Sequence, residues 1–130
     1  MSTLQVTNIL SNTANTPPVI YDSTSTQVGT FCRAWVNFDG TASPGSIKSS
    51  FNVTSITNVG TGVYTVNFTN SMPDANYVST INASRPATDF TCFSLRGNAA
   101  QTTSGVTIVV GTTGFVLAST ANTVQVAIFR

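Results

Sequence analysis

Few side chains in this chain of 130 residues are capable of acid–base or metal chemistry. The chain has no His and no Glu, and its carboxylates are Asp22, Asp39, Asp74 and Asp89. Enzymatic hydrolysis of a glycan usually needs two carboxyl groups across a cleft, one of them with a raised pKa. Asp39 and Asp74 lie in turn-like segments, where Asp is favoured by its hydrogen bonds to the backbone. We therefore expect no enzymatic activity, no metal and no other cofactor.

The two cysteines, Cys32 and Cys92, lie in the apolar runs FCRAWVNF and FTCFSL. A catalytic thiolate needs a neighbouring group that lowers its pKa, usually a His, and the chain has none. A disulfide between them would require Cα atoms within about 7 Å of each other. We interpret both cysteines as small, buried apolar residues.

Charged side chains make up only 7% of the chain, against about 25% in typical globular domains. Instead, 23 Thr, 15 Ser and 12 Asn fill 50 of the 130 positions. Nucleic-acid binding needs clustered cations that neutralise phosphates. The basic residues are widely spaced, at Arg33, Lys48, Arg85, Arg96 and Arg130. We expect no nucleic-acid partner.

Membrane insertion is not expected either. The longest apolar stretch, around residues 106–118, is interrupted by Thr and Gly and is shorter than the ~20 residues that cross a bilayer. The opening MSTLQVTNIL lacks the basic segment and the long apolar segment of a signal peptide. We expect the chain to be made and kept in a reducing compartment.

Period-two alternation of apolar residues dominates the sequence and indicates strands. In residues 31–38, Cys32, Ala34, Val36 and Phe38 share one face. Eight strands are expected, at residues 31–38, 51–57, 63–69, 77–84, 90–96, 106–110, 115–118 and 123–129. Turn residues separate them, so the pattern predicts an all-β, antiparallel, jelly-roll-like β-sandwich over residues 31–130.

Residues 1–30 have a different composition and predict an extended N-terminal arm. Polar, low-complexity stretches surround Pro17-Pro18, and apolar residues are concentrated near the start. An exposed apolar strand tends to aggregate unless it pairs with another strand. We expect the arm to add as a strand to a neighbouring subunit or another protein. The candidate attachment residues are Leu4, Val6, Ile9 and Leu10.

Two polar loops, at residues 85–91 and 97–105, are candidate recognition segments, because loops on a β scaffold often carry binding. The candidate receptor-binding residues of these loops are Arg85, Asp89, Phe90, Arg96 and Asn98. Ordinary solvated loops are the alternative interpretation.

The face of residues 31–37 opposite the expected core carries Phe31, Arg33 and Trp35. A strand that is apolar on both faces suggests that a partner covers one of them. We interpret these three residues as a candidate oligomer interface. A surface that stacks on sugars or binds a peptide is the alternative.

Five segments of the chain form a familiar set: AWVNFDGT (34–41), IKSSFNVTSIT (47–57), GTGVYTVNF (60–68), MPDANY (72–77) and, more loosely, the opening MSTLQV. Together they resemble tail-fibre-like structural proteins of marine and cyanobacterial phages. The specific part of the likeness spans residues 34–77, about a third of the chain.

This resemblance implies a β-rich, homotrimeric virion component, assembled in the host cytoplasm, that binds other virion proteins and a host cell-surface glycan or protein. It implies no catalytic residues. Many relatives are longer, so a capsid decoration or head-fibre protein is an alternative. Alternatives of another class are a glycan-degrading depolymerase and a lectin-like binding module.

Overall fold

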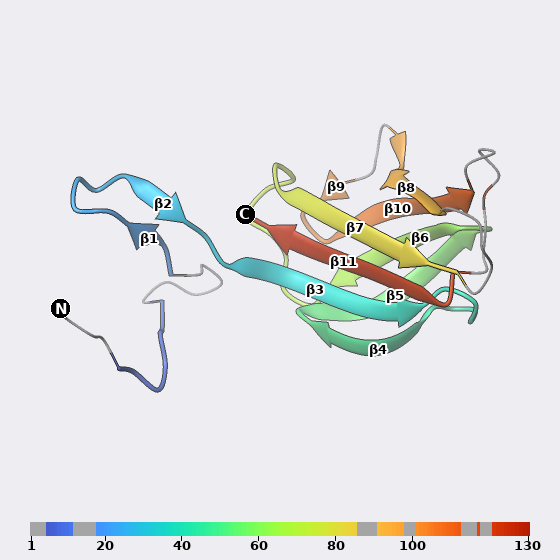
Figure 1. Cartoon of the computed structure of the whole chain (residues 1–130), viewed down its shortest axis with the longest axis horizontal. Helices are drawn as coiled ribbons and strands as arrows, with labels where there is room; N and C mark the ends of the chain where they lie inside the picture. Colours follow the sequence, from blue (N-terminus) through green and yellow to red (C-terminus); the bar gives the residue numbers. More distant parts are fainter. Residues whose placement is uncertain (1–4, 12–17, 86–90, 98–100, 113–116, 118–120) are drawn as a thin grey trace. The chain divides into compact units, whose positions relative to one another are not determined.

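The computed structural model describes residues 5–11, 18–85, 91–97, 101–112, 117 and 121–130, without the side chains of Thr91 and Cys92. The chain divides into two compact units, Met1–Phe31 and Cys32–Arg130. The described residues form eleven β-strands and no α-helix (Figure 1). No helix in these residues is long and apolar enough to cross a membrane.

The first unit contains a small hairpin that the polar sequence did not predict. Strands β1 (Ile20–Tyr21) and β2 (Gln27–Gly29) pair antiparallel. The turn between them is organised by Asp22, whose Oδ1 accepts hydrogen bonds from the backbone N–H groups of Thr24 and Thr26, at 2.8 and 3.0 Å. A low-complexity polar stretch therefore folds locally, because one carboxylate satisfies the turn's backbone donors.

The second unit consists of two sheets in which all neighbouring strands are antiparallel (Figure 1). The first sheet has the order β4 (Ser46–Phe51), β3 (Cys32–Asp39), β11 (Thr123–Phe129), β7 (Val78–Ser84). The second has the order β5 (Val53–Gly60), β6 (Val63–Phe68), β10 (Gly105–Thr112), β8 (Thr91–Leu95), and β9 (Gln101–Thr102) also pairs with β10. The predicted antiparallel β-sandwich is confirmed.

Seven of the eight expected strands correspond to observed ones, namely β3, β5, β6, β7, β8, β10 and β11. The eighth, at residues 115–118, lies outside the described residues except for Leu117, which bridges Gly111. Strand β4 was missed because SIKSSF does not alternate. It forms because β3 pairs with it, with a register shift at Asn37 and Phe38.

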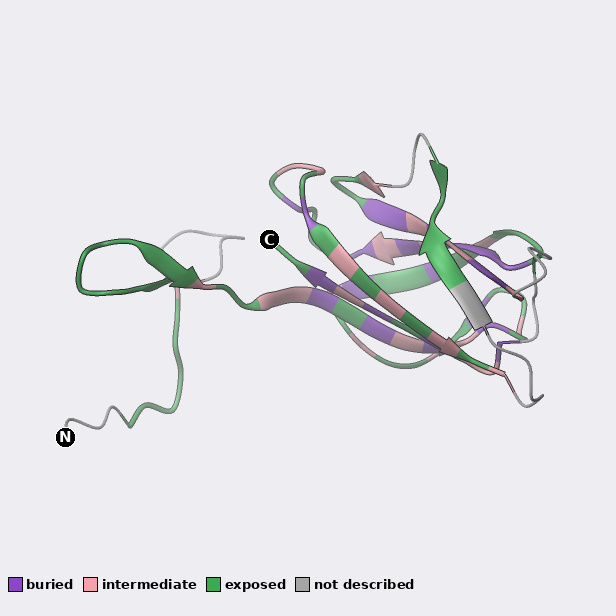
Figure 2. Ribbon diagram, turned by 45° about the horizontal axis from the view of Figure 1, so that its top comes forward, coloured by how far each residue is buried: buried purple, intermediate pink, exposed green. Residues whose placement is uncertain are grey.

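The core lies between the two sheets and is built from the alternate residues that the pattern placed inward. Ala34, Val36 and Phe38 of β3 are buried, whereas Trp35 between them is exposed. Figure 2 shows this alternation as bands of buried and more exposed residues along β3, and of half-buried and exposed residues along β7. The other strands contribute buried Tyr64, Val66, Val106, Ile108, Val110, Val124, Val126 and Ile128.

Two buried tyrosines anchor loops to this core. The Tyr64 hydroxyl donates to the carbonyl oxygen of Gly40 at 2.7 Å, and the Tyr77 hydroxyl donates to that of Gly105 at 2.7 Å. Burial raises the pKa of both phenols, which keeps them protonated as donors. Each bond gives a buried phenol hydroxyl an acceptor, as buried polar groups require.

The chain passes from the first sheet to the second at Asn52, between β4 and β5. Its φ of 54° lies in the left-handed region, which Asn tolerates better than most residues. Its Nδ2 donates to the carbonyl oxygens of Arg33 and Asn70, both at 3.1 Å, and its Oδ1 accepts from the Asn70 N–H at 2.7 Å. This one side chain therefore connects the end of β4, the strand β3 and the segment after β6.

Candidate functional site

The receptor-binding candidates are only partly described. Asp89, Phe90 and Asn98 lie outside the described residues. Arg85 is half-buried directly after β7 and Arg96 is exposed directly after β8, so the two follow strands of different sheets. The role of these loops stays a prediction.

The interface and attachment candidates divide between the two units. Trp35 is exposed on the outer face of β3 and Arg33, on the same strand, is half-buried, whereas Phe31 belongs to the first unit. Val6, Ile9 and Leu10 are exposed in that unit, and Leu4 lies outside the described residues. The surroundings of Trp35 are therefore set by the neighbouring strands of the first sheet.

Strand pairing places two rows of side chains across the outer face of this sheet. What we call the amide row has Asn37 at its centre, opposite Ser49 on one side and Gln125 on the other, and Gln125 pairs in turn with Asn82. The second row, the Trp35 row, runs in the order Phe51, Trp35, Ala127 and Thr80. Each row contains one residue from each of the four strands.

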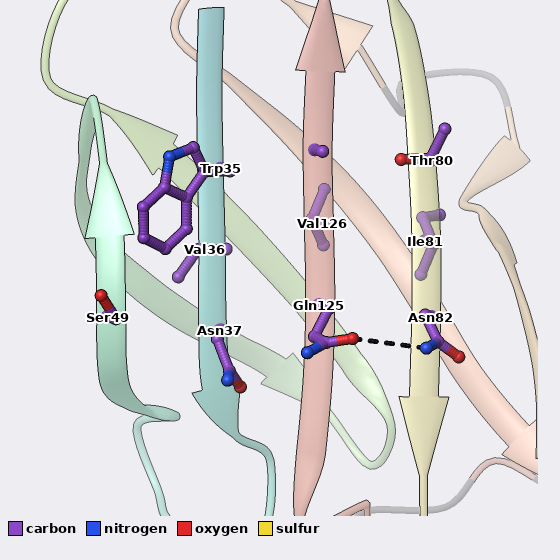
Figure 3. Close-up of a pocket in the computed structure, with 10 residues that line it drawn as sticks. Trp35, Val36, Asn37, Ser49, Thr80, Ile81, Asn82, Gln125 and Val126 are labelled. Carbon is purple, nitrogen blue, oxygen red and sulfur yellow. Dashed lines mark hydrogen bonds between the residues drawn. The ribbon is translucent and has the colours of Figure 1, made fainter. Parts of the chain in front are cut away.

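A groove of about 460 Å³ lies on these rows, over β4, β3, β11 and β7 (Figure 3). In the picture, the indole ring of Trp35 lies between β3 and β4, and the amides of Asn37, Gln125 and Asn82 follow one another across three strands. Between Trp35 and Thr80 the row holds only the methyl group of Ala127. This short side chain leaves the hollow between its larger neighbours.

The groove combines an apolar wall with uncharged hydrogen-bonding groups. Its lining contains no Asp, Glu, Lys or Arg. Asn82 Nδ2 donates to Gln125 Oε1 at 3.3 Å, which leaves the Asn82 oxygen and the Gln125 nitrogen for other partners. The Oδ1 atom of Asn37 is shielded from solvent and has no hydrogen-bond partner among the described residues. Such a site suits a neutral ligand that both donates and accepts hydrogen bonds.

A second hollow, of about 420 Å³, lies between two loops of the sandwich, residues 40–43 and 58–61. Its lining is small and polar and contains no aromatic side chain. An aromatic ring supplies a large rigid apolar surface to a binding site. The groove at Trp35 is therefore the stronger candidate site.

The described carboxylates are all held as anions. Hydrogen bonds from Arg130 lower the pKa of Asp74, with the guanidinium bound through two contacts of 3.0 and 2.6 Å. Hydrogen bonds from the Thr41 side chain and backbone lower the pKa of Asp39, and the Thr24 side chain lowers that of Asp22 most strongly. A general acid at neutral pH needs the opposite shift.

These shifts predict how stability depends on pH. A carboxyl group with a lower pKa in the folded state stabilises the protein above its ordinary pKa of 3.8, and this contribution is lost as pH falls through the lowered value. Since the chain has no His, we expect the melting temperature to vary by less than about 8 °C between pH 5.5 and 8, and to fall below pH 4. Thermal unfolding followed by circular dichroism measures this. Asp74→Asn should weaken the acidic decline, and an equal decline in that variant would contradict the assignment.

Potential metal ligands and thiols are few in the described residues. They contain no group of three or more His, Cys, Asp or Glu side chains close enough to hold a metal ion. Cys32 is a free, half-buried thiol that donates to the carbonyl oxygen of Ala34 at 3.2 Å. It is thus less buried than predicted, and the Cys92 side chain is not described.

Sequence reasoning identified Trp35 but missed the other lining residues that belong to the two rows. They are Asn37, Ser49, Thr80, Asn82, Gln125 and Ala127. Alternation does place Asn37 on the same face as Trp35. The missing information was the order β4-β3-β11-β7, which brings residues from four distant segments together.

Comparison with known proteins assigns no family to this chain. No family model matches it, and neither the curated proteins nor the solved structures contain a match.

Proposed function

We propose that this chain is a structural component of a phage virion, of the tail-fibre or fibre-tip kind, that contributes to adhesion to the host surface. The observation that carries the proposal is the exposure of apolar side chains in the described part of the first unit. The resemblance of residues 34–77 to tail-fibre-like proteins supports the same conclusion. We propose binding rather than catalysis, because none of the described carboxylates has the raised pKa that a general acid needs.

The first unit is proposed as the attachment end. Ile9 and Leu10 are 61% and 86% exposed, and the β1–β2 hairpin adds exposed Ile20, Tyr21 and Val28. Exposed apolar side chains at neighbouring positions are typical of surfaces that contact other proteins, and an exposed strand edge pairs readily with another chain. We propose that this unit joins copies of the chain into a homotrimer and connects them to other virion proteins.

The oligomeric state tests this proposal. We expect the full chain at micromolar concentration to have the mass of three copies of 13.6 kDa, about 41 kDa, in light scattering coupled to gel filtration. The double variant Ile9→Ser/Leu10→Ser should shift this mass toward that of the monomer, because it removes the apolar contact. The melting temperature of the sandwich should stay unchanged.

Val59→Ser is the control, since Val59 is 48% exposed but lies in the sandwich. It should leave the trimer intact. A monomeric full chain, or a double variant that assembles like the wild type, would contradict the proposed role of the first unit.

A further inference from the structure

We infer that the groove over β4, β3, β11 and β7 binds a neutral carbohydrate, with Trp35 as the stacking surface and Asn37, Gln125 and Asn82 as hydrogen-bonding partners. The inference deepens the proposed adhesive function and rests on it. It assigns the recognition surface to a sheet face, in addition to the loops considered from the sequence.

The hydrogen-bonding groups of the groove match a polyhydroxyl ligand. A side-chain amide carries one acceptor oxygen and two N–H donors, whereas each sugar hydroxyl both donates and accepts. Because Asn82 Nδ2 donates to Gln125 Oε1, the oxygen of Asn82 is left as an acceptor and the N–H groups of Gln125 are left as donors. Two neighbouring sugar hydroxyls can match this pair, because one can donate to the Asn82 oxygen while the other accepts from the Gln125 amide. The hydroxyls of Ser49 and Thr80 add two more such groups at the edges.

Trp35 supplies the apolar part of the site. Its side chain is 39% exposed at one wall of the groove (Figure 3). An indole ring offers a large rigid apolar face together with one N–H donor. A pyranose ring has an apolar C–H face and a polar rim of hydroxyls, so it fits between this wall and the amide row.

The absence of charge in the lining selects the class of carbohydrate. An anionic sugar in this groove would lose hydration without meeting a cation, which costs free energy. The lining contains no charged side chain, and Lys48 of β4 donates instead to the carbonyl oxygen of Asn122 at 2.6 Å. Neutral sugars meet no such cost, so we expect them to be preferred over uronic or sulfated ones.

The size of the groove sets the expected affinity. A volume of about 460 Å³ lies in the range of small-molecule sites and suits one to two sugar rings. Because the site is an open groove on a sheet, we expect a dissociation constant on the order of 1 mM per site. Several copies on one particle would raise the apparent affinity through multivalency.

A second copy of the chain is the competing occupant. The cores of obligate interfaces between copies are apolar and have few polar groups without partners. The amide row crosses all four strands of this face, so a flat apolar partner would leave its donors and acceptors unsatisfied. A polyhydroxyl ligand satisfies them, and we therefore favour the carbohydrate.

Trp35 is the only tryptophan in the chain, so its fluorescence reports directly on the groove. The full chain is titrated with three neutral trisaccharides, cellotriose, maltotriose and chitotriose, and with trigalacturonic acid as the anionic comparison. We expect a saturable change in emission with at least one neutral sugar. Ala127→Leu, which fills the hollow, and Asn82→Ala/Gln125→Ala, which removes two amides, should each weaken binding at least tenfold.

Phe93→Ala is the control, because Phe93 is a similarly exposed aromatic residue (42%) on β8 of the other sheet, and it should bind like the wild type. Three results would overturn the inference: no response to any neutral trisaccharide, equal binding by Ala127→Leu, or preference for trigalacturonic acid. An oligomeric state that changes in Ala127→Leu would also overturn it, by making the groove an interface between copies. The Ile9→Ser/Leu10→Ser variant tests assembly separately, so failure of either proposal can be recognised.

Discussion

Replacing Gly105 with Ala is expected to lower the melting temperature of the sandwich by about 10 to 20 °C. A Cβ atom at this first residue of β10 would lie 2.6 Å from the carbonyl oxygen of Val66 on β6. This oxygen belongs to the backbone of β6, a central strand of the second sheet, so it cannot rotate away from the new Cβ atom as a side chain could. Moving it would disturb the β10–β6 pairing and the bond from Tyr77 to the Gly105 carbonyl. Such overpacking costs about 2 to 3 kcal/mol.

Gly60→Ala is the matched control for this variant. A Cβ atom at Gly60, the last residue of β5, would meet no atom within 4 Å. We expect its melting temperature to stay close to that of the wild type. Thermal denaturation followed by circular dichroism compares the two variants. Equal losses would mean that loss of glycine itself, rather than the clash with Val66, governs stability.

Asn52→Ala should destabilise the sandwich by about 3 kcal/mol, because it removes two separate contributions. A residue with a Cβ but no polar side chain costs about 1 to 2 kcal/mol in the left-handed region. The variant also removes the three hydrogen bonds to Arg33 and Asn70. The bond to the Arg33 carbonyl is partly buried, so its loss is not fully compensated by water, whereas the two bonds to Asn70 are exposed.

Two further variants separate these contributions. Asn52→Gly accepts the φ of 54° but lacks the side-chain bonds, and we expect it to lose about half as much stability as Asn52→Ala. Asn52→Asp keeps the acceptor for the Asn70 N–H and loses both donated bonds. Urea denaturation gives the free energy of unfolding of each variant.

The control for the Asn52 series is Asn58→Ala. Asn58 makes a single bond from its oxygen to the Gly60 N–H in an exposed turn, so its replacement should cost well under 1 kcal/mol. Equal stability of Asn52→Ala and the wild type would contradict the role of this corner. Because Asn52 follows Phe51, the neighbour of Trp35 across β3 and β4, a loosened corner should also change the tryptophan emission.

The fold class could be predicted from the sequence because strand alternation is a local property. Period two follows from the pleat of a single strand and needs no partner. Ala34, Val36 and Phe38 were therefore placed inward, and Trp35 outward, before any tertiary contact was known. For the same reason β4 escaped prediction: SIKSSF has no alternation, and only pairing with β3 makes it a strand.

The groove was decided by tertiary structure alone. Asn37, Asn82 and Gln125 are more than 40 residues apart in sequence. Nothing in the local sequence around one of them indicates that it lies next to the others. They form one row because β3, β11 and β7 are neighbours in register. Backbone hydrogen bonds that join strands are nearly independent of side-chain identity, so local sequence does not specify which strands pair. That choice follows from burying all apolar faces at once in a single core, a property of the whole chain.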